Sequence, residues 1–595
     1  MLFSHKKSLR GYYWEINEFD EKKVKQIQLK YNFSENLSKL IVIRGIDIDR
    51  VDEFINPRIK NMLGDPSTLK DMNKGINIIC DAILNNEIIG IYGDYDVDGI
   101  TSTALFKNYL DMIGIKSVPY IPNRNKEGYG LNIDALKKIK NKNVNLVVTV
   151  DCGISNVSVC ESAKEIGLRI VITDHHLGNI KMPDVEAIIN PNRIDESDNK
   201  YKILSAVGVV FLILTCLNKK LDDIGFFKKN NIKKPNLLLF LDLVALGTVC
   251  DVMPLVGLNR AFVLQGLKLI EQRKNLGIKS IIDTAKIEEE IIDVYHIGFI
   301  IGPRLNATGR VGESKLSCEI LYIKKEIEAK KLALELEKYN IERQRMEADM
   351  LKDVIGILDE KNEENKTKNI IFVENDSWHE GLVGILASRL KDKYDKPVFV
   401  ATKLSDKYKV SCRSVKGVNI GNAILSAMTE NMLIDGGGHE MAGGFNLELS
   451  NIDSVKKFME GKLNEDVKNY INNKKKNIDL IMECNSLTIN LLKELDKLKP
   501  FGSGNVRPKI VIRNACIIRD FIVGKNNDNL RLIISDKSVG HKNYISAMFF
   551  KLKKEDEFRK FLTKGKIVSL YGEASVNKYK NKESIQFLIE DVMLE

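Results

Sequence analysis

Residues 91–102 have the sequence IYGDYDVDGITS, in which an apolar run gives way to three alternating aspartates, Asp94, Asp96 and Asp98. The run EIIGIYG that ends at Gly93 is rich in isoleucine, and the stretch TSTALFKNYLDMIG that follows has a helical pattern. Alternate residues of an extended segment point the same way, so the three carboxylates should face one side. They repel one another there, which raises the question of what compensates their charge.

The same strand-then-helix rhythm continues from about residue 75 to 255. Three further apolar runs, VNLVVTV, LRIVIT and VEAIIN, are rich in Val and Ile and lie at 144–150, 168–173 and 185–190. The helical stretches between the runs, such as NVSVCESAKEIG, end in a glycine that suits a helix C-terminus. This βαβ pattern predicts an α/β fold with a mostly parallel sheet that is covered by helices on both faces.

The rest of the chain divides into three further patterns. Residues 313–355 lack Gly and Pro and are dense in Glu, Lys, Leu and Ile, which predicts a long connecting helix. A second α/β segment follows, with strands predicted at NIIFVEN and KPVFVAT. The last 95 residues contain short β-rich runs, among them NLRLIISD and IVSLYGEAS, which predict a small β-barrel of the oligonucleotide-binding (OB) type.

Length and composition exclude several classes of protein. A chain of 595 residues with 44% hydrophobic and 29% charged residues should form about three to five globular domains. No apolar run is long enough to cross a membrane, and the N-terminus lacks the apolar core of a signal peptide, so we expect a cytoplasmic protein. Nine cysteines without a CxxC pair argue against a disulfide framework or a structural zinc site.

The net charge is +10, and it is concentrated near the C-terminus. Residues 501–595 hold 18 Lys and Arg against 11 Asp and Glu, a surplus of +7. Two explanations of this surplus remain open. The composition could simply be rich in lysine, or the C-terminal region could bind the phosphates of a nucleic-acid backbone.

Acidic residues and histidines follow the strands at three places. Asp94, Asp96 and Asp98 follow the first strand, Asp151 follows VNLVVTV, and the sequence Asp174-His175-His176 follows LRIVIT. The carboxyl ends of parallel strands meet at one edge, where open α/β sheets bind ligands. Asp251, in ALGTVCDVMPL, comes after an apolar helical run and could approach from the side.

This set of ligands predicts a two-metal site. A single aspartate in a loop is more often a turn or N-cap residue, and Thr101 or Ser102 could cap the next helix. Four acidic segments that converge are better explained by Mn²⁺ or Mg²⁺, which prefer oxygen and imidazole ligands over thiolates. Two ions bridged by one carboxylate would activate a water for in-line attack.

Other chemistries lack their motifs. No GxGxxG follows a strand and no GxxxxGK[ST] is present, which excludes the usual dinucleotide and P-loop sites. The His-Glu pairs at 379–380 and 439–440 are not zinc-protease motifs, because Val383 and Gly443 stand where the second histidine is needed.

With GDYDVDG, VDCGIS, TDHH and GTVCDVMPL in this order, the chain resembles the DHH phosphoesterase superfamily, and most closely its RecJ-type single-stranded-DNA-specific exonucleases. The resemblance covers about residues 40–595 and includes IPNRNKEGYGLN, INPNR, IGPRLNATGR, SCRS, DGGGHEMAGG and PFGSGN. It implies a lead-in at 1–40, a DHH domain at 41–312, a connector helix at 313–360, a DHH-associated domain at 361–470 and an OB-fold at 471–595.

The resemblance also implies roles for individual residues. The metal ligands would be Asp94, Asp96, Asp98, Asp151, His175 and Asp251. Asp151 would bridge the ions, and His176 would lie near the scissile phosphate, so that Asp151, His175 and His176 form the catalytic set. Single-stranded DNA would contact Arg124, Tyr129, Arg304, Arg310, Ser411, Arg413 and His439.

The function implied is a processive 5′→3′ exonuclease that releases 5′-mononucleotides in DNA repair and recombination. The resemblance implies a monomer without membrane attachment, and it makes a helicase or a single-strand-binding protein a plausible partner. One alternative is a DHH phosphodiesterase for short oligonucleotides or cyclic dinucleotides, against which the basic C-terminal region argues. A second is a non-enzymatic scaffold, against which the intact acidic set argues.

Overall fold

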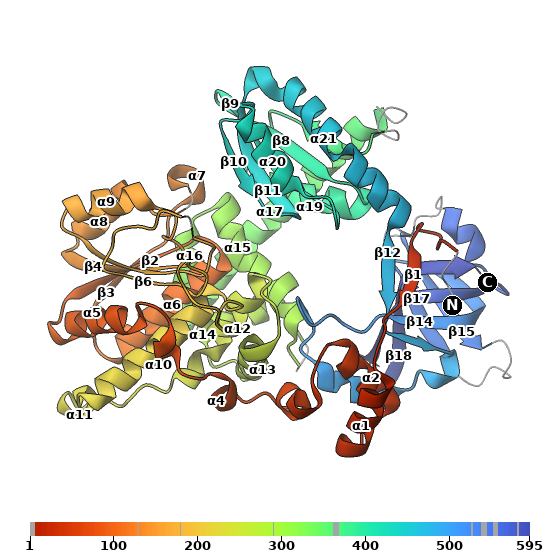
Figure 1. The fold of residues 1–595 in the computed structure, drawn as a ribbon, viewed down its shortest axis with the longest axis horizontal. Coiled ribbons are helices and arrows are strands. Elements are labelled where there is room, and N and C mark those ends of the chain that lie inside the picture. The colour runs from red at the N-terminus through yellow and green to blue at the C-terminus, as the bar shows by residue number, and fades with distance from the viewer. Residues whose placement is uncertain are drawn as a thin grey trace.

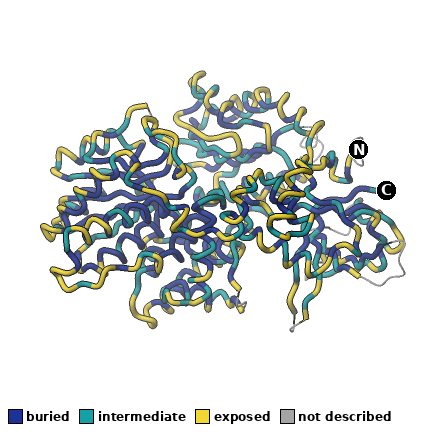
Figure 2. The backbone as a smooth tube through the Cα atoms, turned by 60° about the horizontal axis from the view of Figure 1, so that its bottom comes forward, coloured by how far each residue is buried: buried dark blue, intermediate teal, exposed yellow. Residues whose placement is uncertain are grey.

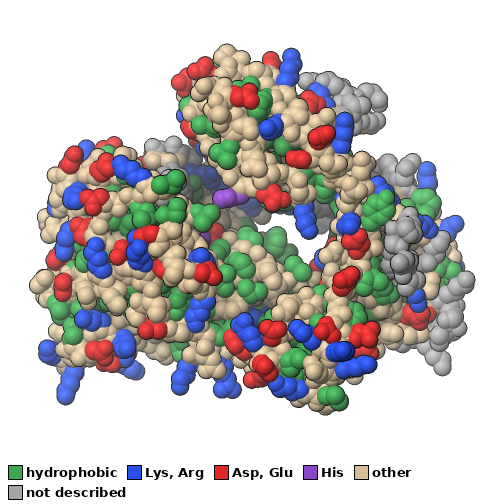
Figure 3. Space-filling view, viewed as in Figure 1, with side chains coloured by type: hydrophobic (Ala, Val, Ile, Leu, Met, Phe, Trp, Pro, Cys, Tyr) green, Lys and Arg blue, Asp and Glu red, His purple; other side chains and the backbone are tan. Residues whose placement is uncertain are grey.

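The computed structural model describes residues 6–128, 130–178, 180–288, 291–360, 368–524, 527–536, 544–550, 552, 557–579 and 582–594. The chain forms three bodies, which are a large α/β lobe, a smaller α/β domain above it and a barrel beside both (Figure 1). The space-filling view is hollowed where the three bodies face one another (Figure 3). Within the described residues, no helix is long and apolar enough to span a membrane.

The large lobe is built on a five-stranded sheet in which every pairing is parallel, with strand order β3-β2-β4-β5-β6. The strands are β2 (Ile88–Gly93), β3 (Ser117–Tyr120), β4 (Val144–Val150), β5 (Arg169–Thr173) and β6 (Ala187–Ile189). The helices near the sheet are α5 (Met72–Leu84), α6 (Val97–Met112), α7 (Arg124–Glu127), α8 (Ile133–Lys140) and α9 (Val157–Glu165). The predicted parallel α/β architecture is confirmed.

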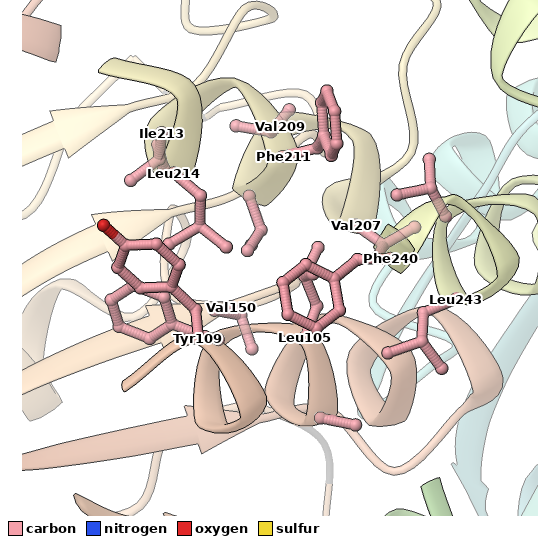
Figure 4. Close-up of a cluster of buried hydrophobic side chains, with 14 of the residues drawn as sticks. Leu105, Tyr109, Val150, Val207, Val209, Phe211, Ile213, Leu214, Phe240 and Leu243 are labelled. Atoms are coloured by element: carbon pink, nitrogen blue, oxygen red, sulfur yellow. The ribbon is translucent and has the colours of Figure 1, made fainter. Parts of the chain in front are cut away.

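Helix α6 lies between the sheet and a further layer of helices. That layer contains α10 (Ala206–Asp223), α11 (Phe226–Lys229), α12 (Leu241–Cys250), α13 (Gly257–Glu271) and α14 (Leu276–Thr284). Leu105 and Tyr109 of α6 pack toward Val207 and Leu214 of α10 and Leu243 of α12 (Figure 4). The largest apolar core therefore surrounds the helix that begins at the aspartate motif. Buried residues, dark blue in Figure 2, predominate in the core around α6.

The connector differs from the single helix expected over 313–360. The structure has α16 (Ser314–Tyr322) and α17 (Glu326–Glu360), preceded by a π-helix (His296–Ile301) and α15 (Gly302–Val311). Ile323 takes an extended conformation, with φ −66° and ψ 143°, and ends α16. Glu326 and Glu328 then stand in the first turn of α17, where negative charge stabilises the N-terminus of a helix.

The second α/β domain has a mixed sheet of order β10-β11-β9-β8-β7. Its strands are β7 (Ile371–Glu374), β8 (Val398–Leu404), β9 (Lys407–Arg413), β10 (Asp435–Gly438) and β11 (Ala442–Glu448), and its helices are α19 (Val383–Tyr394), α20 (Ile420–Thr429) and α21 (Ile452–Asn473). Only β7 and β8 pair in parallel, and the remaining pairs are antiparallel.

The C-terminal domain is a closed barrel. The order β13-β14-β15-β16-β18-β17 closes because β14 also pairs with β17. The elements are β13 (Leu480–Met482), α22 (Ile489–Leu495), β14 (Ile510–Val523), β15 (Asn529–Asp536), β16 (Ile545–Phe549), β17 (Ile567–Tyr579) and β18 (Lys582–Leu594). The predicted OB-type barrel is confirmed.

The N-terminal residues belong with the barrel. Strand β1 (Tyr13–Ile16) pairs in parallel with β12 (Lys475–Ile478). The helices α1 (Glu21–Tyr31), α2 (Glu35–Ile43) and α3 (Val51–Ile55) follow, and a short α4 (Ile59–Met62) leads into the large lobe. Leu37, Ile41 and Phe54 share one core with barrel residues. The boundary expected at residue 40 therefore differs from the packing, because apolar residues on both sides of it cover the barrel.

Candidate active site

The aspartate motif forms the turn between β2 and α6. Asp94 and Asp98 are buried, whereas Asp96 is half-buried and caps α6 by accepting a 3.1 Å hydrogen bond from the Gly99 amide. Thr101 does not cap the helix, since its hydroxyl donates to a carbonyl within α6. A Cβ at residue 99 would lie 2.5–2.7 Å from the Asp94 main chain, so only glycine permits this tight turn.

The start of helix α10 holds Asp98. The carboxylate accepts hydrogen bonds from the main-chain amides of Ala206, at 2.6 Å, and Val207, at 3.0 Å. The first amides of a helix have no partner within the helix and carry partial positive charge, so they suit an anion. Asp98 therefore has a fixed orientation.

The predicted ligands meet at the carboxyl edge of the sheet. The Nε2 atom of His175 lies 3.2 Å from an Asp151 oxygen, 3.6 Å from an Asp251 oxygen and 3.8 Å from an Asp98 oxygen. Three groups have ligand atoms within 4.8 Å of one another, namely Asp94 with Asp96 and Asp151, Asp98 with His175 and Asp251, and Asp151 with His175 and His176. All seven residues predicted for the metal and catalytic sets are thus brought together.

The pKa values of the cluster are strongly shifted by burial and by neighbouring charges. Burial, together with neighbouring carboxylates, raises the pKa of Asp94 to about 8 and that of Asp251 to about 7, and it raises the pKa values of Asp98 and Asp151 well above the usual range. Burial also lowers the pKa of His175 to about 4, which leaves its imidazole neutral and able to ligate.

Three buried atoms of the cluster form no hydrogen bond with any described residue. They are Asp94 Oδ1, Asp151 Oδ1 and His175 Nε2. Buried polar atoms nearly always have a partner, so this group of acceptors indicates a ligand. Carboxylate oxygens and a neutral imidazole are ligands that Mn²⁺ accepts, and the residues present fit such ions.

Asp174 orients the second histidine of the motif. The Asp174 carboxylate lies 2.8 Å from His176 Nδ1 and also accepts from the main-chain amides of Ile154, His175 and His176. Burial opposes a charged imidazole at His176, but Asp174 outweighs burial and raises the pKa of His176 to about 9. The side chain of His176 is 44% exposed, unlike that of His175, which is 8% exposed.

A cavity of about 620 Å³ opens between the large lobe and the second α/β domain. From the large lobe it is lined by Arg124, Phe299 and Arg310, and from the second domain by residues that include Ser411 and Arg413. The Arg124 guanidinium lies 5.2 Å from the centre of the Tyr95 ring, and Tyr95 stands between Asp94 and Asp96 in the sequence. The cavity is therefore adjacent to the acidic cluster.

Three arginines give this cavity an excess of positive charge. None of Arg124, Arg310 and Arg413 forms an ion pair with a carboxylate in the part of the chain that the structure describes, and each lines the cavity. Burial, then the charge of Arg124, lowers the pKa of Arg310 to about 10. The cations that line the cavity outnumber its carboxylates, which come from Glu380, Asp392 and Asp435. Arginines held close together favour an anion with several acceptor oxygens, such as a phosphate.

Two of the predicted DNA contacts, Arg304 and His439, do not line this cavity. The Arg304 guanidinium instead forms two hydrogen bonds with the Glu337 carboxylate of α17. His439 is exposed in the turn between β10 and β11. Tyr129 lies outside the described residues.

Family models match three segments of the chain. The model described as DHH family, N-terminal domain, matches residues 88–248. The DHHA1 domain matches residues 367–465, and the RecJ OB domain matches residues 478–591.

Named relatives match most of the chain. It is 31% identical over 590 residues to the single-stranded-DNA-specific exonuclease RecJ of Bacillus subtilis, covering 97% of this chain and 70% of that protein. The chain belongs to the RecJ family. RecJ of Escherichia coli is 35% identical over 419 residues, which cover 69% of this chain and 72% of that protein.

Solved RecJ structures share the fold. A crystal structure of Thermus thermophilus RecJ in complex with Mn²⁺ superimposes with a TM-score of 0.80, at 24% identity over 98% of this chain and 79% of the other. A second structure, titled as exonuclease RecJ bound to manganese, has a TM-score of 0.56 at 30% identity and covers 67% of this chain and 97% of the other.

Sequence reasoning missed several residues near the site. The sequence pattern assigns no separate role to Asp174, which the structure places against His176. Arg389 and Lys409 line the cavity, and no motif in the sequence points to them. Asn190 and Asn192 contact the main chain of the two histidines. The signal that could have found the asparagines is INPNR, since it follows the strand next to the DHH strand.

Proposed function

We propose that this RecJ-family chain is a single-stranded-DNA-specific exonuclease, which removes 5′-mononucleotides in the 5′→3′ direction with two Mn²⁺ or Mg²⁺ ions. The observation that carries the proposal is the cluster of buried ligand atoms at Asp94, Asp151 and His175, which have no hydrogen-bond partner among the described residues. The cluster is adjacent to a cavity lined by three arginines that no described carboxylate pairs with. The relatives named as single-stranded-DNA-specific exonucleases support the same activity, and RecJ structures with Mn²⁺ and with Mg²⁺ support the choice of ions.

We assign the ligands from the distances. Asp94, Asp96 and Asp151 would hold one ion, and Asp98, His175 and Asp251 the other, with Asp151 as the bridge because it lies 3.2 Å from His175. The bound ions would neutralise the carboxylates and supply an activated water for attack on phosphorus.

His176 would donate a hydrogen bond to the phosphate that reacts. Its Nδ1 is held by Asp174, and its raised pKa keeps the imidazole protonated near neutral pH. A cationic donor at this position stabilises the negative charge that develops on the phosphoryl oxygens. The exposed His176 ring, rather than the buried His175 ring, is therefore the one assigned to the substrate.

The polarity of digestion would come from the arginine-lined cavity. A terminal 5′ phosphate has more negative charge than an internal phosphodiester and fits beside Arg124, Arg413 and the Ser411 hydroxyl. Arg310 lines the same cavity and would also contact the terminal phosphate. The exposed His439 does not line the cavity, and we assign it to a part of the DNA strand outside the cavity. Arg304 is better assigned to the ion pair with Glu337 than to DNA.

The alternative of a phosphodiesterase for very short oligonucleotides is less well supported. The closed barrel and the helices that pack on it form a third wall around the hollow, which suits a longer strand. We further propose that the protein acts as a cytoplasmic monomer, to which a helicase or a single-strand-binding protein presents the strand.

The test uses 5′-labelled single strands, the matching duplex and a dinucleotide, each with Mn²⁺ or with EDTA. We expect rapid release of labelled mononucleotide from the single strand with Mn²⁺ only. Equal digestion of the duplex, or activity confined to the dinucleotide, would contradict the proposal. Full activity of a His175→Ala or Asp98→Ala variant would contradict the metal assignment.

A further inference from the structure

The sequence INPNR, residues 189–193, takes no part in the function proposed so far. It follows β6, which pairs in parallel with β5, and β5 ends at the DHH motif. Thr173 stands opposite Ile189 in this pairing, so the two loops leave the sheet side by side. The INPNR loop thus lies beside the segment that carries both histidines.

Two side-chain amides of this loop hold the main chain of the histidines. The Asn190 amide donates a 2.9 Å hydrogen bond to the carbonyl oxygen of His176. The Asn192 amide donates to the carbonyl oxygen of His175, at 2.7 Å, and to that of Lys202, at 3.1 Å. Consecutive carbonyls of the DHH motif are therefore each bound by a different asparagine.

The loop itself is firmly anchored. The main-chain amide of Asn192 donates to the Asn190 side chain at 2.7 Å, which fixes the two asparagines relative to each other. The buried Arg193 donates to the Ile188 carbonyl and forms ion pairs with Asp71, at 2.9 Å, and Asp195, at 2.6 Å. The asparagines therefore belong to a rigid support.

We propose that Asn192 and Asn190 are positioning residues, with Asn192 setting the direction of His175 toward the metal and Asn190 setting that of His176 toward the phosphate. This inference rests on the proposed function. A carbonyl that is held in place fixes the backbone torsion of its own residue, and with it the direction in which the side chain leaves the chain. An amide does this without adding charge, whereas a cationic side chain here would repel the metal ions.

A purely structural role for the asparagines accounts for only part of this geometry. Asparagine is common in turns because its side-chain oxygen binds an amide two residues on, as Asn190 does with Asn192. A turn makes no use of the two side-chain amide nitrogens, yet both point to histidine carbonyls. Asn199 offers a comparison, since its amide holds the Pro191 and Ser197 carbonyls of the same region but touches no site residue.

The test compares Asn192→Leu and Asn190→Asp with Asn199→Leu as the matched control. Mn²⁺ binding to the whole chain is measured by the electron paramagnetic resonance of free Mn²⁺, and kcat and KM are measured on a 5′-phosphorylated single strand at saturating Mn²⁺. We expect Asn192→Leu to weaken binding of one of the two ions by about 10–100-fold. Asn190→Asp keeps the oxygen that accepts from the Asn192 amide and loses only the donor to His176. It should bind Mn²⁺ like the parent and lower kcat by about tenfold or more, with KM little changed.

The inference is overturned if both variants bind Mn²⁺ and turn over like Asn199→Leu, or if both lose the two properties together. If Asn192→Leu does not fold, Asn192→Asp keeps the shape of the side chain, removes the amide donor, and is held to the same expectation. A parent protein that binds two Mn²⁺ ions but leaves single strands intact would refute the proposed function, while the Mn²⁺ titration still decides the role of Asn192.

Discussion

Asp151 is held at the centre of the cluster by an unusual backbone. Its φ is +65°, the left-handed region that residues other than glycine seldom adopt. Such a conformation costs about 1–3 kcal/mol and persists only where the surroundings enforce it. Here the Asp151 amide donates to the Thr173 carbonyl, which ties the turn to the end of β5 and brings the carboxylate to His175.

Stability of the metal-free protein should depend on pH. In the native state the pKa of Asp94 is about 8 and that of Asp251 about 7, against about 3.9 for an unfolded aspartate. The native state thus holds more protons than the unfolded state, and stability falls as pH rises toward 8. His176 acts in the same direction between its unfolded pKa of about 6.5 and its native pKa of about 9, whereas His175 acts oppositely, but only below about pH 6.5.

We therefore expect the melting temperature in EDTA to fall between pH 6.5 and 8.5, and added Mn²⁺ to remove most of the fall by keeping the carboxylates ionised. Differential scanning fluorimetry measures both series. Asp94→Asn serves as the control, since it has no proton to lose and should show a shallower fall in EDTA. Parallel curves in EDTA and Mn²⁺ would argue against a metal site.

Arg413 should distinguish 5′-phosphorylated ends. Arg413→Ala removes a cation that forms no ion pair with a described carboxylate, and we expect KM for a 5′-phosphorylated strand to rise about 10–100-fold, the value of a charge-assisted hydrogen bond. A strand with a 5′ hydroxyl should be affected much less. Arg389→Ala is the matched control, because Arg389 lines the same cavity but is paired with Glu347. Equal effects on the two strands would rule out this role for Arg413.

The clustering of the acidic residues and histidines could be predicted from sequence because most of them stand directly after strands of a parallel sheet. Arg304 could not be judged in this way, since only the three-dimensional structure brings Glu337 of α17 to its guanidinium. The same limit applies to Asn192, whose partners His175 and Lys202 are distant in sequence.

At the scale of elements, helix α12 must approach α6 very closely. A Cβ at Gly247 would lie 2.5 Å from Asp98 Oδ1 and from Thr101 Oγ1, and 2.6 Å from Val207 Cγ1. Gly247 thus lets α12 pack directly behind Asp98, a proposed metal ligand. The absence of a side chain here is a requirement of the packing of α6, α10 and α12.

Gly247→Ala should therefore lower both stability and Mn²⁺ affinity. The added methyl overpacks the core by about 1–3 kcal/mol and displaces Asp98. Gly461→Ala is the control, since Gly461 lies within α21 with open space at its Cβ and should gain about 0.5–1 kcal/mol. Thermal unfolding and Mn²⁺ titration measure the two effects. If Gly247→Ala bound Mn²⁺ normally, the close packing would not matter to the site.

The elements themselves were predictable where the pattern is local. The spacing of hydrophobic residues, the Val and Ile content and the glycines at helix ends predict the strands of the parallel sheet and the helices between them. The break at Ile323 was not predictable, because residues 313–355 contain no Gly or Pro that would end a helix. The Lys324 ammonium donates a hydrogen bond to the Asn108 side chain of α6, so a tertiary contact helps to place this turn.

At the scale of the whole molecule, Asp395 joins the second α/β domain to the N-terminal and barrel segments. Its carboxylate accepts from the hydroxyls of Tyr12, at 2.9 Å, and Tyr470, at 2.6 Å, and from the Lys474 ammonium at 2.8 Å. Tyr12 directly precedes β1, and Lys474 directly precedes β12. One half-buried charge therefore connects three segments that are remote in sequence.

Asp395→Asn should loosen this junction. Asparagine tolerates the left-handed backbone of residue 395, where φ is +53°, so the change removes charge without adding backbone strain. We expect faster amide hydrogen exchange in β1 and at the end of α21, with little change in the core around α6. Asp392→Asn, at an exposed pair with Lys391, is the control. Unchanged exchange in β1 would mean that strand pairing alone holds the junction.

The pairing of β1 with β12 has a consequence for biosynthesis. On the ribosome, residues 13–16 emerge long before residues 475–478, with which they pair. At about 5–20 residues per second, the nascent N-terminal segment waits roughly 20–90 s for its partner. The large lobe has time to fold meanwhile, while the apolar residues of α1 and α2 that pack on the barrel remain uncovered. Residues 13–16 thus leave the ribosome long before they can reach their native place.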